Sequence, residues 1–397
     1  MRDDQSAQRR LKFDCETAQV RIFQILEANA NTAIAANQTW RRNLYEPLLD
    51  LGHEVVLFSA QDGRQALAHN NAPLRARFSQ QMVDTFRSEH AHRPFDLVFA
   101  YLMDGMVDPA AIDELRRSGV PVTNFSCNNI HQFDLVDTLS PHFDLNLHAE
   151  KEARAKFLAV GANPLWWPMA SNPTYFKPVA TPRSLAASFV GANYALRARY
   201  LVHLLQNQVD VHIYGPGWLS GDLSRQRALA KRIYFLGLAA LAPSAERRCW
   251  ASAKLEELDF RSSVARRFPT QVHPPVSDDE LVALYSRSHV SLGFLEVYDR
   301  HDPTRPVTQH LHLREFEAPM CGALYCTGYL DELAEHFEPD TEVVVYRSPH
   351  ELLDKVRFYL ANPAAAERVR QAGMQRARQE HTYHRRFQSL FHSLGLQ

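Results

Sequence analysis

Short apolar segments alternate with amphipathic segments along most of this chain, and this alternation restricts the fold more than any other feature of the sequence. The first half has predicted strands at Val20–Leu26, Glu54–Ser59, Asp96–Tyr101, Pro121–Phe125, Phe143–Leu147 and Leu165–Pro168. Predicted helices separate them, at Trp40–Leu51, Leu74–Glu89, Asp108–Ser118 and Glu150–Val160. Strands that alternate with helices in this way form a parallel sheet with helices on both faces. We therefore predict an α/β fold of the doubly wound type.

The alternation stops at residues 170–183, where three prolines favour a linker, and restarts at Ala186–Val190. Further strands are predicted at Val211–Tyr214, Gln271–His273, Val290–Phe294, Ala323–Thr327 and Glu342–Tyr346, and helices at about 348–361, 364–379 and 382–394. A chain of 397 residues is too long for one ordinary core. We predict two similar Rossmann-like domains that face each other, at 19–175 and 184–378, after a flexible leader at 1–18 and before a last helical segment at 379–397.

Residues 219–267 interrupt the second domain. They are rich in Arg, Ala and Leu and lack clear strands, so we predict a helical insertion. Its basic residues are most simply a solvated face, and an acceptor-binding or oligomer surface is the less favoured interpretation. These residues are Arg225, Arg227, Lys231, Arg232, Arg247 and Arg248.

Composition excludes few functions but indicates the kind of partner and the cellular compartment. Lys and Arg number 44 against 45 Asp and Glu, giving a net charge of −1, so nucleic acid is not expected as the principal partner. Five cysteines are an odd number and are unclustered, which favours reduced thiols and a cytoplasmic protein. No apolar run approaches the length of a membrane span, and the N-terminus lacks the apolar stretch of a signal peptide.

The segment Leu313–Gly322 carries the strongest functional signal. A helix is predicted to begin there with a carboxylate in its first turn, and small residues follow. Gly322 then ends the helix before a buried strand. At the carboxyl edge of a doubly wound sheet, a helix N-terminus favours an anionic group such as a diphosphate. Arg314 can add a two-pronged donor to that anion, and Glu317 can accept hydrogen bonds from sugar hydroxyls. The alternative is that Glu317 only complements the helix dipole, which leaves Arg314 and the glycine exit unexplained.

Several motifs together carry a family resemblance. The strongest stretch contains Leu313–Glu317, Cys321-Gly322, Phe337-Glu338-Pro339, Glu342–Tyr346, Asn362-Pro363 and His381-Thr382-Tyr383 with Arg386. Support comes from Trp167–Ala170, Phe176-Lys177-Pro178, Ser188–Gly191 with Arg197, and Tyr214–Trp218. From Val20 to Phe391 the chain resembles GT-B glycosyltransferases, and within that fold the CgeB-like (spore-maturation) branch of the glycosyl transferases group 1 superfamily.

The resemblance implies that the C-terminal domain holds a nucleoside-diphosphate sugar, that the N-terminal domain binds the acceptor across a cleft, and that the last helix crosses back to the first domain. The implied donor-binding residues are Gly191, Arg197, Gly215, Gly217, His273, Arg314 and Glu317. Physical alternatives stay open for most of them: the glycines can serve turns alone, Arg197 can be a solvated helix residue, and the prolines after His273 fit an ordinary connection.

One departure from the pattern leaves the stereochemistry open. Many retaining GT-B enzymes carry two glutamates with seven residues between them, and Glu317 matches the second while Gln309 occupies the place of the first. An inverting reaction needs a protein base instead. The candidates are His131, which is preferred because imidazole titrates near neutral pH, and Asp104. Asn29 and Asn31 can bind acceptor hydroxyls or form a turn.

Metal chemistry is the rival interpretation for the histidines. His310 and His312 lie on one side of an extended segment, with His301-Asp302 upstream, but spacing fixes no third ligand. The aspartate pair of GT-A enzymes has no counterpart here. We therefore expect no metal and no cofactor other than the donor substrate.

The sequence thus predicts a glycosyltransferase of hexosyltransferase type that moves a sugar from a nucleoside diphosphate to a carbohydrate, protein or small-molecule acceptor. A nucleotide-sugar epimerase of the same fold and a catalytically silent nucleotide-sugar-binding protein remain as alternatives. The donor sugar, its base, the acceptor and the oligomeric state are left open.

Overall fold

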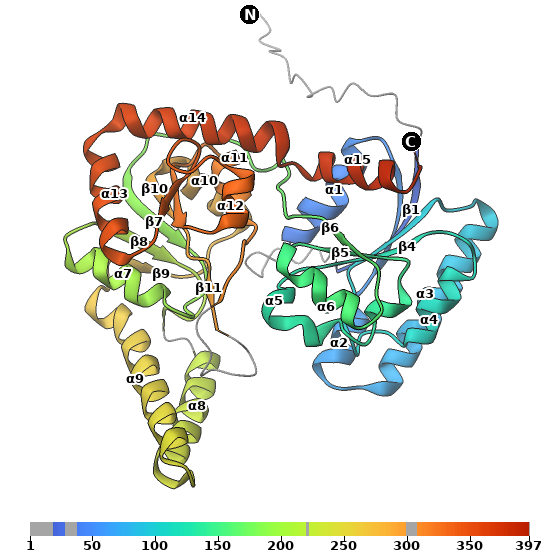
Figure 1. The fold of residues 1–397 in the computed structure, drawn as a ribbon, viewed down its shortest axis with the longest axis horizontal. Helices are drawn as coiled ribbons and strands as arrows, with labels where there is room; N and C mark the ends of the chain where they lie inside the picture. The colour runs from blue at the N-terminus through green and yellow to red at the C-terminus, as the bar shows by residue number, and fades with distance from the viewer. Residues whose placement is uncertain (1–18, 28–37, 220–221, 299–307, 397) are drawn as a thin grey trace, which may run out of the picture.

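The computed structural model describes residues 19–27, 38–219, 222–298 and 308–396, without the side chains of 222–228. Two six-stranded parallel sheets lie side by side, each covered by helices (Figure 1). This arrangement confirms the predicted α/β class and the two facing, doubly wound halves. The predictions for the leader at 1–18, for Asn29 and Asn31, and for His301-Asp302 concern residues outside the described ranges.

The N-terminal sheet has the strand order β2-β1-β3-β4-β5-β6. Its strands are β1 (Arg21–Leu26), β2 (Glu54–Ser59), β3 (Leu97–Ala100), β4 (Val122–Ser126), β5 (Leu145–His148) and β6 (Pro164–Trp166). Every residue of β1, β3 and β4 is buried, because helices cover both faces of a parallel sheet. Strand β3 accordingly appears in the sequence as a continuous apolar run, whereas β1 and β4 also bury polar residues: Arg21, Gln24, Thr123, Asn124 and Ser126.

The helices of this half are α1 (Glu46–Asp50), α2 (Gln61–Ala68), α3 (Ala72–His92), α4 (Pro109–Arg116), α5 (Asn129–Gln132) and α6 (Arg154–Ala159). Helix α2 was not predicted. It contains Gly63, a residue type that disfavours helix formation. A Cβ at that position would stand 3.0 Å from the Phe78 ring on α3, so the close packing of the two helices explains why a glycine is present. The predicted helix Trp40–Leu51 is in fact a π-helical turn, Arg41–Tyr45, followed by α1.

The C-terminal sheet has the order β14-β13-β10-β7-β8-β9. Its strands are β7 (Leu185–Val190), β8 (Val211–Tyr214), β9 (Val272–His273), β10 (Ser288–Leu292), β13 (Tyr325–Gly328) and β14 (Val344–Tyr346), with a small hairpin formed by β11 (Glu296–Val297) and β12 (Thr308–Gln309). Its helices are α7 (Arg197–Gln206), α10 (Asp278–Arg287), α11 (Arg314–Met320), α12 (Asp331–His336), α13 (Pro349–Ala361) and α14 (Pro363–Glu380).

Two long helices, α8 (Asp222–Leu241) and α9 (Ala245–Arg267), occupy the segment where a helical insertion was predicted. The Ser244 hydroxyl caps α9 by accepting a hydrogen bond from the Arg247 N–H at 3.2 Å. The pair forms a hairpin that projects from the C-terminal half, away from its sheet (Figure 1).

The last helix, α15 (Tyr383–Ser393), packs on the N-terminal half (Figure 1). Its first turn is capped by Thr382, whose hydroxyl accepts a hydrogen bond from the Arg385 N–H at 3.2 Å. The buried Phe387 contacts Phe99 of β3 and Trp167. One continuous apolar core therefore runs through both halves and holds them together.

Candidate functional site

A cavity of about 870 Å³ opens between the two halves. Residues from both halves line it: Thr39, Trp40, Cys127, Asn128 and Met169 from the first, and Val190, Gly191, Ala192, Gly215, Pro216, Pro275, Val276, Leu281, Tyr285, His312, Leu313, Arg314 and Glu317 from the second. Gly191 and Gly215 directly follow β7 and β8, so the cavity lies at the carboxyl edge of the second sheet. Ligands of doubly wound folds bind at this edge.

Gly191 and Gly215 bring bare backbone to the cavity wall. A Cβ on Gly215 would stand 2.3 Å from the carbonyl oxygen of Gly191, and its φ of +137° disfavours any side chain. A Cβ on Gly191 would stand 2.8 Å from the Phe189 ring and 3.0 Å from Nη2 of Arg314. Gly217, with φ +81°, packs against Asn193 and is not among the residues that line the cavity.

Two arginines approach the same glycine. Arg314 lines the cavity, and its Nη1 is enclosed without a hydrogen-bond partner in the described part of the chain. Arg197 lies behind the wall, 1% exposed, and donates to the Ala192 carbonyl at 3.1 Å and the Tyr194 hydroxyl at 2.5 Å. Burial, and then the charge of Arg314, lower the pKa of Arg197 to about 10. Neighbouring guanidinium groups beside exposed backbone form a positively charged corner, and Arg197 is a buried residue rather than a solvated one.

Glu317 lines the same cavity and is only 5% exposed. Burial raises the pKa of its carboxyl to about 7. The side-chain amide of Asn43, on the π-helical turn of the other half, is 3.5 Å from Oε1 of Glu317, and its carbonyl accepts a hydrogen bond from the Asn172 N–H at 3.0 Å. The carboxyl is thus held at the junction of the two halves.

The start of α11 differs from the predicted free helix N-terminus. The helix has seven residues, and Glu315 folds back to accept a hydrogen bond from the His312 N–H at 2.6 Å. The Tyr325 hydroxyl donates to the other oxygen of Glu315 at 2.7 Å. A short helix whose N-terminus already binds its own carboxylate adds little to anion binding, so the positive character of this corner comes mainly from the arginines.

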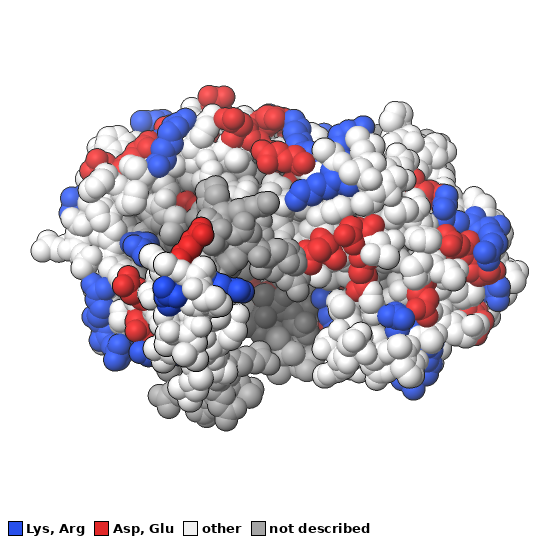
Figure 2. All heavy atoms as spheres, turned by 60° about the horizontal axis from the view of Figure 1, so that its bottom comes forward, with Lys and Arg blue, Asp and Glu red and all other residues white. Residues whose placement is uncertain are grey.

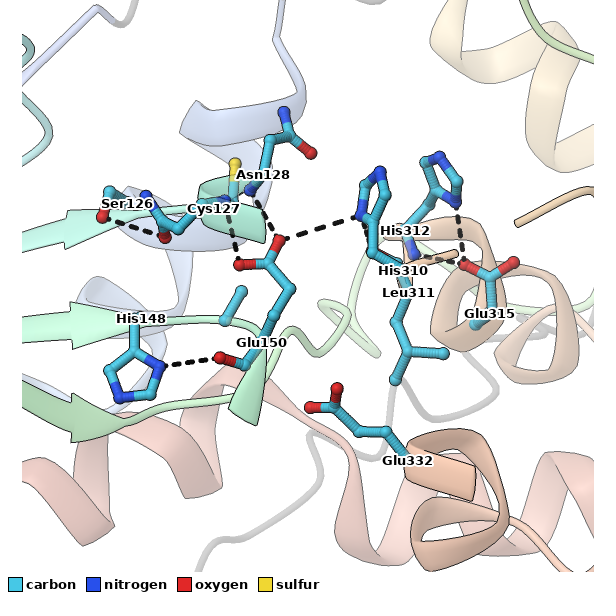
Figure 3. Close-up of polar contacts among 12 residues, drawn as sticks. Ser126, Cys127, Asn128, His148, Glu150, His310, Leu311, His312, Glu315 and Glu332 are labelled. Atoms are coloured by element: carbon cyan, nitrogen blue, oxygen red, sulfur yellow. Dashed lines mark hydrogen bonds and ion pairs between the residues drawn. The ribbon is translucent and has the colours of Figure 1, made fainter. Parts of the chain in front are cut away.

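His310 and His312 lie between the two halves, facing buried carboxylates (Figure 3). The ring of His310 is 4.3 Å from that of His312 and 4.9 Å from that of His131. Burial, and then the neighbouring His131, lower the pKa of His310 to about 3, so it is neutral at physiological pH. His312 lines the cavity, and its Nε2 is 3.2 Å from the Tyr194 hydroxyl. No group of three or more metal-ligating side chains occurs among the described residues.

Glu150 is a buried carboxyl that sequence reasoning did not select. It accepts hydrogen bonds from the N–H groups of Asn128 at 2.6 Å and Asn129 at 3.2 Å, and lies 3.7 Å from Nδ1 of His310 (Figure 3). Burial raises its pKa to about 7. Its position two residues after β5, at the carboxyl edge of the first sheet, is the signal that could have identified it.

Besides Arg197 and Gly217, three further predicted residues lie outside the cavity lining. The ring of His131, on α5, lies beside the ring of His310 and is tilted by 37° from it. Asp104 accepts hydrogen bonds from the N–H groups of Leu139 at 2.9 Å and Thr138 at 3.0 Å, so both of its oxygens fix a loop. His273 stacks on Tyr214 with ring centres 4.5 Å apart.

Residues just after His273 line the cavity, namely Pro275 and Val276. The predicted ligand-facing loop therefore reaches the cavity through Pro275 and Val276 and not through His273. Sequence reasoning also missed Trp40, Thr39 and Tyr285 as wall residues, because a cavity wall between two domains leaves no local sequence pattern.

Residues 193–392, just over half of the chain, match the sequence profile of a family described as glycosyl transferase-like. This chain belongs to the glycosyl transferase-like family. A comparison with curated proteins found no match.

Solved structures of glycosyltransferases share the fold over nearly the whole chain. Sucrose-phosphate synthase from Thermosynechococcus elongatus is 13% identical, with a TM-score of 0.58 over 95% of this chain and 99% of that one. A glycosyltransferase from Rickettsia africae is 10% identical, with a TM-score of 0.55 over 95% and 98%. Anabaena HepE, in complex with UDP and glucose, is 13% identical, with a TM-score of 0.53 over 95% and 100%.

At these identities the matches establish the fold alone, which is the GT-B fold of two facing Rossmann-like halves. The glycosyltransferase has no helix, among the residues described, that is long and apolar enough to cross a bilayer.

Proposed function

We propose that this glycosyltransferase moves a sugar from a nucleoside-diphosphate sugar, bound in the cavity, to an acceptor on the opposite wall. The observation that carries the proposal is the guanidinium of Arg314, which lines the cavity beside Gly191 with an enclosed nitrogen that has no hydrogen-bond partner among the described residues. An arginine keeps its charge inside proteins, and a cation withdrawn from water is costly unless it is paired. A diphosphate supplies both the charge and the acceptor oxygens.

The other groups of the cavity fit the rest of such a donor. Glu317 and Gly215 line the cavity; we propose that Glu317 accepts hydrogen bonds from the ribose hydroxyls and that Gly215 lets the backbone approach the phosphates. The GT-B fold of HepE, solved with UDP and glucose, gives the proposal a structural precedent. We further propose that the chain is a member of the CgeB-like branch and that the transferred sugar is a hexose.

The chemistry proposed for the cavity needs no metal. Arg314 and Arg197 can stabilise the charge that develops on the leaving diphosphate. His131 remains the proposed base for an inverting reaction. It would act through the neighbouring neutral His310 or after a shift of the halves, because it is not among the residues that line the cavity. Gln309, in place of a second glutamate, leaves retaining chemistry dependent on the diphosphate itself.

The acceptor is proposed to bind against Trp40, Thr39 and Asn128, which form part of the wall contributed by the first half. A carbohydrate, a protein or a small molecule remains the acceptor class. We also propose a cytoplasmic location, supported by Cys127, Cys321 and Cys326, which are free thiols.

A donor panel tests the proposal. Thermal unfolding is measured with UDP, GDP, dTDP and their sugars, since a ligand that binds only the folded state raises the Tm. The donor selected in this way is then incubated with acceptor extracts, with and without a chelator. Transfer that survives chelation and is lost in Glu317→Ala supports the proposal. Conversion of the sugar with donor alone indicates an epimerase, and tight binding without turnover indicates a silent binding protein.

A further inference from the structure

Helix α8 exposes more large apolar side chains than any other element in the described part of the chain. The described residues include ten exposed large apolar side chains, and half of them belong to α8. These five are Leu229, Ile233, Tyr234, Leu236 and Leu241, whose exposed fractions are 59%, 61%, 57%, 54% and 83%. The spacing of residues 229, 233 and 236 places these three on one face of the helix. An exposed apolar surface of this kind marks an interaction site.

The apolar side chains cluster toward the outer end of the hairpin formed by α8 and α9. The turn between the two helices, at residues 242–244, is the point farthest from the C-terminal sheet (Figure 1). Leu241 directly precedes this turn, and Leu236 and then Ile233 lie progressively farther from it along α8, toward the domain. At 1.5 Å per residue, these three span about 12 Å of helix axis. The α8 side of the hairpin end is therefore apolar, and the end is narrow because only two helices form it.

Basic residues lie just behind this apolar end. Between Leu223 and Leu241, α8 contains four basic residues and no acidic residue. Of these, Lys231 and Arg232 are exposed, about 15 Å from Leu241 along the axis, and Arg232 forms an ion pair with Asp259 of α9 at 3.0 Å. Arg247 and Arg248 lie in the first turn of α9, and Glu246 is the single acidic residue between positions 229 and 250. Figure 2, which brings the bottom of Figure 1 forward, shows positive and negative side chains interspersed over this face of the molecule.

We propose that this hairpin docks on the surface of a bilayer that contains anionic phospholipids. The apolar end is suited to enter the boundary between head groups and acyl chains, which lies about 5–10 Å deep, and the basic side chains then lie at the level of the lipid phosphates. Tyr234 has the apolar ring and polar tip that are favoured at that depth. The proposal is independent of the sugar-transfer reaction.

A second copy of the chain is the less favoured occupant. Two α8 helices packed together would bring like charges face to face, which opposes association. A stable dimer also buries about 800 Å² on each partner, whereas the end of a two-helix hairpin is narrow. A bilayer presents the opposite charge and needs no complementary shape.

Sedimentation with vesicles tests the inference on the full chain. The protein is mixed with vesicles of phosphatidylcholine alone, or of phosphatidylcholine with phosphatidylglycerol, at low and high salt. We expect binding to the anionic vesicles that weakens with salt, and a roughly tenfold or greater loss of affinity in the variant Ile233→Ser, Leu236→Ser, Leu241→Ser. Because these side chains are exposed, the variant should keep the Tm of the unmodified protein.

The matched control is Leu158→Ser with Phe358→Ser, which removes apolar side chains of similar exposure, 53% and 52%, from other elements. This control should sediment with vesicles like the unmodified chain. Absence of vesicle binding, or equal loss in the control, overturns the inference. So does light scattering that shows a dimer which the α8 variant converts to a monomer while vesicle binding stays unchanged.

Discussion

The guanidinium of Arg314 and the backbone of Gly191 are in contact distance: a Cβ on Gly191 would stand 3.0 Å from Nη2 of Arg314. The glycine ends the first strand of the C-terminal half, and the arginine begins α11, more than a hundred residues later. A third group, Nη1 of Arg197, lies 3.3 Å from the same point. The fold thus gathers two cations around one residue that has no side chain, at the wall of the cavity.

Replacement of that glycine should weaken diphosphate binding. In Gly191→Ala the new methyl group must displace Arg314 or the Phe189 ring, which lies 2.8 Å away, so we expect about a tenfold or greater increase in the Kd for nucleoside diphosphate and a stability loss of about 1–3 kcal/mol. Isothermal titration calorimetry measures the first and urea denaturation the second. Gly237→Ala is the control, because no atom lies within 4 Å of the point that its new methyl group would occupy, and it should leave the Kd unchanged. Equal affinity in both variants would contradict the role of Gly191.

Gly215→Ala should destabilise the fold itself. Its methyl group would stand 2.3 Å from the Gly191 carbonyl oxygen, which is backbone and cannot rotate away, and its φ of +137° is strained for alanine. We expect a loss of about 3 kcal/mol or more in the free energy of unfolding. In Gly119→Ala, where φ is +81° and the space is open, only the backbone strain remains and the loss should be about 1 kcal/mol. A loss in Gly215→Ala no larger than in Gly119→Ala would show that the two loops are not in contact.

Helix α15 should contribute strongly to the stability of the whole chain. Phe387 is fully buried between Phe99 and Trp167, and its truncation to alanine leaves a cavity that costs about 3–5 kcal/mol. Phe358→Ala, at a position that is 52% exposed, should cost less than about 0.5 kcal/mol. Urea denaturation of both variants measures the difference. Similar stabilities would mean that the last helix does not hold the first half.

Stability should fall as the pH rises through the range of the buried carboxyls. Burial raises the pKa of Glu317 to about 7 from 4.5 for an ordinary glutamate, so between these pH values the folded state keeps a proton that the unfolded state has released. The penalty grows from pH 4.5 and is complete above pH 7, at up to about 3 kcal/mol for this group.

Glu317→Gln removes this contribution, so its free energy of unfolding should depend less on pH and should exceed that of the unmodified chain at pH 8. Urea denaturation at several pH values measures both. Glu150, whose pKa is also raised by burial, remains in both proteins, so part of the pH dependence of stability persists in the variant. An unchanged pH dependence in the variant would contradict the burial of Glu317 in the folded state.

Much of the fold was predictable because it is encoded in local patterns. The fully buried β3 appears as an uninterrupted apolar run, and the predicted strands and closing helices match the observed ones within a few residues. Helix α2 was missed because Gly63 satisfies a tertiary contact with Phe78 and not a helical preference. The π-helical turn at Arg41–Tyr45 was missed for a similar reason, since its Asn43 reaches across to Glu317.

The site was predictable in part. Arg314 and Glu317 stand out because they lie at the start of a short helix that leads into a buried strand, and the structure places both on the cavity wall. Asp104 follows β3 and His273 is the last residue of β9, yet their side chains are engaged elsewhere, with Leu139 and Tyr214 respectively. Position after a strand locates the edge of a sheet but does not determine where a side chain points.

A crystal structure of the chain with the nucleoside diphosphate that gives the largest rise in Tm would locate the donor site. We predict that the diphosphate lies beside Gly191 and Gly215, with a phosphate oxygen within hydrogen-bond distance of Arg314, and that the ribose hydroxyls lie at Glu317. A nucleotide bound elsewhere, or a diphosphate in the cavity that leaves the Arg314 guanidinium without a phosphate contact, would contradict it.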